Sequence, residues 1–134
     1  MEQEYVLNGT RITSLEAFWD HISGSVIPGA FWGRNLDAFN DILRGGFGTP
    51  DEGFTLRWTH SAVSREHLSY PETVRQLELR LTRCHPDNRD YVRQQLVEAS
   101  CGRGPTVFDW LVQIIAEHGP GGSEAESNIR LVLD

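Results

Sequence analysis

Two aspartates four residues apart, Asp37 and Asp41, are the side chains whose type and spacing most clearly suggest chemistry. The segment around them, residues 35–44, has an apolar stripe at helical spacing formed by Leu36, Phe39 and Leu43. Both carboxylates therefore lie on one face of a predicted helix, opposite the apolar stripe. A pair of exposed carboxylates can accept charge-assisted hydrogen bonds from the cationic side chains of a basic partner.

Ordinary helix stabilisation is the competing interpretation of these acids. Asp37 falls in the first turn, where it complements the helix dipole, and Asp41 could form a surface ion pair with Arg44. The two aromatics directly before the helix, Phe31 and Trp32, favour a binding face, because aromatics beside a charged patch are typical interface anchors. Burial of Phe31 in the core is an equally good alternative.

No residue pattern for catalysis, a cofactor or a metal emerges. The glycine-rich run at 44–48 follows a helix and precedes a strand, the reverse of a dinucleotide-binding loop, so a helix end with a turn is expected. The five histidines lack zinc-type spacing, and Ser61, Ser64 and His67 lack a nucleophile elbow. We therefore predict that the protein is not an enzyme and has no catalytic residue, cofactor or metal.

Composition and charge are typical of a small acidic globular protein. The 134 residues fit one domain, and 19 acidic residues against 12 arginines give a net charge of −7. This balance disfavours nucleic acid as a partner and favours a basic protein. An acidic N-terminus, the lack of a membrane-length apolar run and two distant cysteines (Cys84 and Cys101) lead us to expect a cytoplasmic protein with reduced thiols and no membrane association.

The middle of the chain offers a rival functional surface. Residues 61–104 hold six acidic residues and seven arginines, whereas the segments on either side are both net acidic. A basic strip that contacts nucleic acid or a second partner could be formed by Arg75, Arg80, Arg83, Arg89 and Arg93. The acids interleaved with them favour ordinary ion-paired helix faces instead.

The elements that must position the acidic pair follow from periodicity and caps. Strands are predicted at 5–7, 54–58 and 129–133. A first helix is expected to begin with Thr13 as its cap, at capping-box spacing from Glu16, and to end at 23–25. The second, at 35–44, has Asn35 as its cap and Gly45 as its stop. A loop and two helices are expected between 61 and 101, and a last helix is expected after Thr106.

Strands that alternate with helices favour parallel pairing through right-handed crossovers. We therefore predict an α/β fold in which a small three-stranded parallel sheet packs with helices in one domain over residues 1–134. Three strands leave little room for a cofactor cleft.

Residues 31–45 resemble the barstar family of intracellular ribonuclease inhibitors. The family pattern begins with two aromatics and a glycine, followed by one variable residue and Asn-Leu-Asp-Ala. Two variable residues and an aspartate then precede the glycine that ends the helix. The matching residues here are Phe31-Trp32-Gly33, Asn35-Leu36-Asp37-Ala38, Asp41 and Gly45. The first strand with its Asn8-Gly9 turn and the last strand also resemble the barstar family. The resemblance covers about 4–60 and 105–134, and 61–104 is predicted to be an inserted helical pair.

The resemblance implies an inhibitor, of the kind that serves as an immunity protein, that occludes the active site of a basic, guanyl-specific microbial ribonuclease. It further implies a one-to-one complex with an extracellular-type enzyme and a monomer when free. The implied partner-binding residues are Phe31, Trp32, Asn35, Asp37, Asn40, Asp41 and Gly45. The Asp41 carboxylate would stand in for substrate phosphate against the enzyme's arginine and histidine.

Three departures from the family pattern keep an alternative open. Phe31 and Trp32 stand where the family has tyrosines, and Asn40 stands where it has a tryptophan. The family's glutamate on the last helix has no clear counterpart, although Gln113 and Glu117 lie near its place. The alternative function is an interaction or regulatory module that has the barstar fold and a partner other than a ribonuclease.

Overall fold

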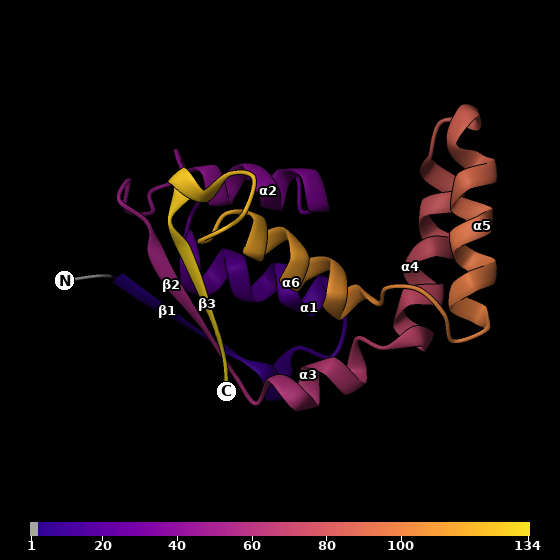
Figure 1. The fold of residues 1–134 in the computed structure, drawn as a ribbon, viewed down its shortest axis with the longest axis horizontal. Helices are drawn as coiled ribbons and strands as arrows, with labels where there is room; N and C mark the ends of the chain where they lie inside the picture. The colour runs from indigo at the N-terminus through magenta and orange to yellow at the C-terminus, as the bar shows by residue number, and fades with distance from the viewer. Residues whose placement is uncertain (1–2) are drawn as a thin grey trace.

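A parallel three-stranded sheet organises the computed structural model, which describes residues 3–134 (Figure 1). The strands are β1 (Gln3–Asn8), β2 (Phe54–Thr59) and β3 (Ile129–Leu133). β2 lies in the centre, and its Leu56 is in register with Tyr5 of β1 and Leu131 of β3. The predicted α/β class and the parallel sheet are confirmed.

Six α-helices accompany the sheet within residues 3–134. They are α1 (Leu15–His21), α2 (Leu36–Arg44), α3 (Ser61–His67), α4 (Tyr70–Arg83), α5 (Arg89–Ser100) and α6 (Val107–Glu117). α1, α2 and α6 lie on one side of the sheet, whereas α4 and α5 form an antiparallel hairpin that projects away from it (Figure 1). No helix within residues 3–134 has the length and apolar character needed to cross a membrane.

An aromatic cluster joins the sheet to the helices. Phe18 of α1 lies with its ring centroid 5.3 Å from that of Phe39 in α2 and 5.2 Å from that of Trp58 in β2. Trp58 in turn lies 5.1 Å from Phe108 of α6. All four side chains are almost completely buried. α2 is therefore fixed on the body of the protein by dense packing of its inner face.

α2 begins and ends where the sequence predicts. The Asn35 side chain accepts a hydrogen bond from the Ala38 amide at 2.8 Å, and Gly45 closes the helix with φ of 113°. Leu36, which the periodicity places in the buried stripe, is only half-buried. It lies in the first turn, where the helix passes the edge of the core and borders a groove.

The first helix differs from its prediction at both ends. Its cap is Ser14, whose hydroxyl accepts the Ala17 amide at 3.1 Å, and not Thr13. The Glu16 side chain pairs with Arg75 and Gln76 of α4, so it does not return to the cap. The chain also continues past the expected stop at 23–25 in a π-turn, Ile22–Val26, whose first and last residues are buried.

The loop expected after Ser61 is the helix α3, and it belongs to the body of the protein. Ser64 is completely buried, accepts a hydrogen bond from Trp58 Nε1 at 2.9 Å and donates one to the Gly9 carbonyl at 2.8 Å. Leu68, just after the helix, joins the main core. Hydrophobic periodicity misses α3 because a hydrogen-bonded serine occupies its buried position.

The helical pair predicted within 61–104 is α4 and α5. This hairpin has its own small core of Leu77, Val92 and Ala99. Polar contacts tie its base to the body: Thr73 Oγ1 accepts the Val107 amide at 2.9 Å, Glu72 accepts the Leu15 amide at 2.8 Å, and Arg75 and Gln76 bind Glu16 of α1. Trp110 of α6 also packs against the small core of the hairpin. The rest of the hairpin extends beyond the body (Figure 1).

Candidate protein-binding site

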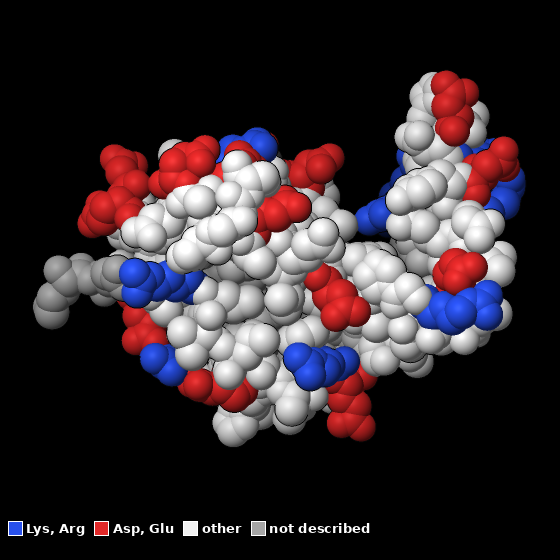
Figure 2. Space-filling view, in the orientation of Figure 1, with Lys and Arg blue, Asp and Glu red and all other residues white. Residues whose placement is uncertain are grey.

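The outer face of α2 carries the acidic pair. Asp37 and Asp41 are both exposed, one helical turn apart, as the sequence predicts. In Figure 2 acidic side chains gather over α2 and the neighbouring chain, and the projecting hairpin leaves this surface open. A protein partner can therefore reach both carboxylates.

Asp41 forms the ion pair with Arg44 that its spacing suggests, at 2.8 Å. Arg44 also contacts Glu124, with Nε 2.6 Å and Nη2 3.2 Å from its two carboxylate oxygens. This hydrogen bonding lowers the pKa of Glu124 and raises the pKa of Arg44. One guanidinium therefore serves two carboxylates, so the cluster remains net negative, and the Asp41 side chain is still 59% exposed.

Asp37 differs from Asp41 in having no ion-pair partner within residues 3–134. It lies in the first turn of α2, where the helix dipole favours a negative charge. The two carboxylates thus offer one uncompensated charge and one shared charge on the same face.

The loop before α2 presents one aromatic and buries part of the other. Phe31 is fully exposed, with a relative accessibility of 100%. Trp32 is half-buried: its ring lies edge-on to Trp19 at 5.4 Å, and its Nε1 donates to Ser23 Oγ at 2.8 Å. Arg34, at φ of 51°, pairs with Asp20 at 2.6 Å. Trp32 and Arg34 therefore anchor the loop, while Phe31 is free to contact a partner.

Asn35 and Gly45 have structural contacts at the two ends of α2. The side-chain oxygen Oδ1 of Asn35 caps the helix, and the side-chain nitrogen Nδ2 lies 3.4 Å from the backbone carbonyl oxygen of Gly33. Gly45 adopts a backbone conformation that residues with a Cβ rarely adopt. Both residues keep the acidic face in a regular helix, whatever they contact in a complex.

Asn40 points toward the interior. Its Oδ1 lies 2.6 Å from Nε2 of His118, whose Nδ1 lies 2.9 Å from Ser127 Oγ. His118 is completely buried, and burial lowers its pKa despite the Glu124 carboxylate 3.6 Å away. The neutral imidazole therefore donates from Nε2 to Asn40 and accepts the Ser127 hydroxyl at Nδ1. This chain of bonds connects α2 to the end of α6.

The carboxylate that reaches α2 from the C-terminal part of the chain is Glu124. Gln113 and Glu117, the two residues that the sequence places near the family's late glutamate, are exposed on α6. Glu124 lies instead in the segment after α6, where the Glu117 carbonyl accepts its backbone amide at 2.8 Å. Neither Glu124 nor His118 belongs to a recognisable motif, so sequence reasoning missed both.

Other kinds of site find no support in the described residues. No group of three or more histidine, cysteine, aspartate or glutamate side chains in residues 3–134 could hold a metal ion. Cys84 and Cys101 are both free thiols. The chemistry available at α2 is therefore charge-assisted hydrogen bonding by carboxylates, next to an exposed aromatic ring.

Comparison with known protein families agrees with this arrangement. A family model described as "Barstar (barnase inhibitor)" matches residues 2–99, which is more than half of the chain. The chain belongs to the Barstar family. The Barstar match contains the whole of α2 and the loop before it, and it runs on through α3, α4 and most of α5. A search of curated proteins found no match.

Barstar-family proteins are ribonuclease inhibitors, so at the family level this chain has the fold of an inhibitor of a barnase-type ribonuclease. The family match is longer than the resemblance that the sequence suggests, which stops at about residue 60 and resumes at 105. It ends before α6 and β3, although α6 packs against α2 and β3 completes the sheet.

Proposed function

We propose that the protein binds a basic, guanyl-specific microbial ribonuclease and occludes its active site with the outer face of α2. The observation that carries this proposal is the exposure of Asp37 and Asp41 on one face of a helix that is rigidly held from behind. A ribonuclease active site must bind the phosphate of RNA with cationic side chains. Carboxylates at hydrogen-bonding distance satisfy the same side chains.

Asp41 is the proposed mimic of the substrate phosphate. Arg44 would compete with the enzyme for this carboxylate, but two of its three guanidinium nitrogens face Glu124. Only Nη1 is directed at Asp41. Glu124 therefore binds most of the Arg44 guanidinium and leaves most of the Asp41 carboxylate available to a cation on the partner.

Binding of this kind is strongest when the binding face is already ordered before the partner arrives. Phe39 fixes the inner face of α2 in the aromatic cluster, and the bond from Asn40 to His118 fixes its middle. Asn35 and Gly45 define its ends. Phe31 is the proposed apolar anchor beside the acids, whereas Trp32 contributes mainly by holding the loop.

The proposed complex contains one inhibitor and one extracellular-type ribonuclease. We propose that the free protein is a cytoplasmic monomer, that it has no catalytic activity of its own, and that it acts as an immunity protein. A negative face paired with a basic enzyme also implies that association slows as salt is added, because screening weakens electrostatic steering.

A second function is a Barstar-fold interaction module with a partner other than a ribonuclease. The observation in its favour is that two of the polar groups on α2 already have partners within the protein: Asn40 bonds to His118, and Asp41 bonds to Arg44. In this alternative the polar groups of α2 stabilise the fold through these intramolecular bonds, and the partner binds at another surface.

Inhibition of RNA cleavage separates these functions. Purified protein is titrated into barnase and into a panel of other basic guanyl-specific ribonucleases, with and without guanosine 3′-monophosphate as a competing active-site ligand. The proposal predicts stoichiometric loss of cleavage for at least one enzyme, relieved by the nucleotide. Full cleavage by every enzyme, in the presence of protein shown to be folded, would favour the interaction module.

A further inference from the structure

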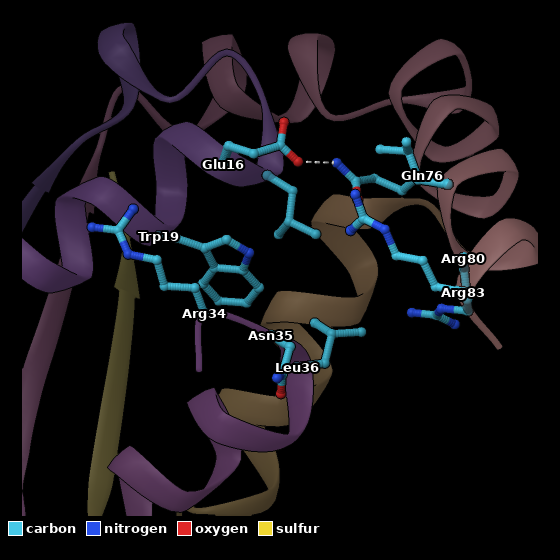
Figure 3. Close-up of a pocket in the computed structure, with 10 residues that line it drawn as sticks. Glu16, Trp19, Arg34, Asn35, Leu36, Gln76, Arg80 and Arg83 are labelled. Carbon is cyan, nitrogen blue, oxygen red and sulfur yellow. Dashed lines mark hydrogen bonds between the residues drawn. The ribbon is translucent and has the colours of Figure 1, made fainter. Parts of the chain in front are cut away.

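A groove of about 330 Å³ separates the hairpin from the body of the protein (Figure 3). α1 and the start of α2 form one wall, with Trp19 and Leu36 among its residues, and α4 forms the other, with Arg80 and Arg83. The lining combines apolar side chains, among them Leu15 and Leu79, with arginines. Figure 2 shows the notch between body and hairpin, with a basic side chain on the hairpin side.

The arginines on the α4 wall have no carboxylate partner within residues 3–134. Arg80 lies over the ring of Trp110, 5.2 Å from its centroid, and Arg83 is exposed. The other charges of the groove are compensated. Arg34 pairs with Asp20, and Glu16 is bound by Arg75 and Gln76. The α4 wall therefore carries positive charge that nothing within the described chain neutralises.

The groove continues directly into the acidic face. Asn35 and Leu36 line the groove and also begin α2, so the two surfaces share residues. In Figure 1 the hairpin extends past α2, which makes α4 a side wall for any protein seated on that helix. A partner that covers Asp37 and Asp41 would thus lie next to Arg80 and Arg83.

We propose that the groove binds a carboxylate-bearing segment of the same protein partner whose basic surface covers α2. This inference rests on the proposed function, in that it assumes a protein partner at α2. Charge complementarity selects the occupant: two uncompensated arginines in a groove that also has apolar side chains suit aspartate or glutamate side chains on a partly apolar segment. The neighbouring acids repel an RNA phosphate backbone, so a protein carboxylate is favoured over nucleic acid.

Opposite charges in adjacent patches would fix the orientation of the partner. A partner must then present cations to α2 and carboxylates to α4 in the matching order, and a rotated partner would meet like charges at both patches. The hairpin would act as a selector among ribonucleases that share a basic active site but differ at its border.

The first arm of the test uses a hexaglutamate peptide as the probe and follows amide NMR shifts of the full-length protein. We expect saturable shifts along α4 and at the start of α2. Arg83→Glu should abolish these shifts. Arg89→Glu should keep them, because Arg89 is also exposed on the hairpin and has no ion-pair partner within residues 3–134, but does not line the groove. No saturable shifts, equal losses in both variants, or equivalent binding of oligouridine at the groove would overturn the proposal.

The second arm measures the affinity of barnase for the same three proteins. Because charge reversal removes an attraction and adds a repulsion, we expect Arg83→Glu to weaken binding about tenfold and Arg89→Glu to leave it unchanged. If wild-type protein binds barnase and both variants bind equally well, the groove proposal fails and the proposed function stands. If the peptide occupies the groove but no ribonuclease is bound, the groove stands and the ribonuclease partner is wrong. Circular dichroism checks that Arg83→Glu, in the last turn of α4, remains helical.

Discussion

The body of the protein and the α4–α5 hairpin are held together in different ways. The body buries a continuous core in which α1, α2, β2 and α6 each contribute an aromatic ring to one cluster. The hairpin buries three hydrophobic side chains of its own and is attached to the body through polar groups and through Trp110 of α6, which packs against the hairpin core. A binding face on α2 is therefore rigid, whereas the hairpin beside it depends on a small core and a few hydrogen bonds.

The two proposed binding surfaces differ in the same way as the regions that carry them. The acidic face lies on a helix whose inner side chains, Phe39, Ile42 and Leu43, are almost completely buried, so its charges are fixed in space before binding. The basic groove lies between the body and the hairpin, so its width depends on the attachment of α4. Substitutions that weaken one region and spare the other test the comparison.

The largest expected effect is in the body. Phe39→Ala removes a completely buried ring from the contact between α2 and α1, and we expect it to lower the free energy of unfolding by about 3–5 kcal/mol. Phe31→Ala is the matched control, because the fully exposed Phe31 should change stability by less than about 0.5 kcal/mol. Urea unfolding of both variants measures the difference. Similar losses would show that the loop ring is buried.

The hairpin should respond locally to loss of its core. Leu77→Ala removes a side chain that is 1% exposed, at a cost of about 2–3 kcal/mol. Because the buried core of the hairpin is separate from the main core, amide exchange should accelerate in α4 and α5 and remain slow in β2. Val97→Ala, at an exposed position of α5, should leave exchange unchanged. Equal acceleration in β2 would mean that the two regions unfold as one unit.

Loss of the Glu72 carboxylate, which joins α4 to the start of α1, should have the next largest effect on the free energy of unfolding. It is 8% exposed and accepts hydrogen bonds from the Leu15 amide, Arg75 and Gln76. We expect Glu72→Gln to cost about 1–3 kcal/mol, since buried donors lose their charged acceptor. Glu78→Gln, at an exposed position of the same helix, should cost less than about 0.5 kcal/mol.

The same carboxylate predicts a pH dependence. Burial alone would raise the pKa of Glu72, but its hydrogen bonds and the charge of Arg75 outweigh burial and lower this pKa from 4.5. A carboxylate with a lowered folded pKa stabilises the protein above its unfolded pKa, and this stabilisation is lost as the pH falls through the folded pKa. Unfolding measured from pH 6 to pH 3 should show a loss below about pH 4.5 that is smaller in Glu72→Gln. Parallel curves would contradict this assignment.

The smallest expected effect concerns His118, which ties α2 to the end of α6. Burial lowers its pKa from 6.5. Below pH 6.5 the imidazole of His118 is therefore protonated in the unfolded chain more readily than in the folded protein. Stability should therefore fall as the pH decreases below 6.5, by at most about 1.4 kcal/mol for each unit by which the pKa is lowered. His118→Gln should flatten this slope between pH 7 and pH 5. An unchanged slope would assign the titration to another group.

Local signals in the sequence identify α2 almost completely. The cap at Asn35, the stop at Gly45 and the exposure of both aspartates follow from residue types and helical spacing, and all are present in the structure. The three strands and the start of α6 after Thr106 are equally local. These features need no knowledge of distant residues, which is why spacing alone predicts them.

Long-range polar contacts could not be predicted in this way. Asn40 and His118 are 78 residues apart, and Arg44 and Glu124 are 80 residues apart. Nothing near these residues in the sequence indicates their partners, because each contact is created by the packing of α6 and the segment after it against α2. Ser64 is similar, since its buried hydroxyl depends on Trp58 of β2 and on Gly9, which directly follows β1.

Calorimetric titration of barnase with wild-type protein, Asp41→Ala and Asp90→Ala tests the inhibitor function most directly. Asp41 and Asp90 both pair with an arginine three residues later, so the two variants lose the same charge and the same kind of ion pair on different helices. We expect one-to-one binding by the wild type, a loss of at least about 30-fold in affinity for Asp41→Ala, and wild-type affinity for Asp90→Ala. Equal affinities for all three proteins, or no binding by the folded wild type, would contradict the proposal that the acidic face of α2 occludes a barnase-type active site.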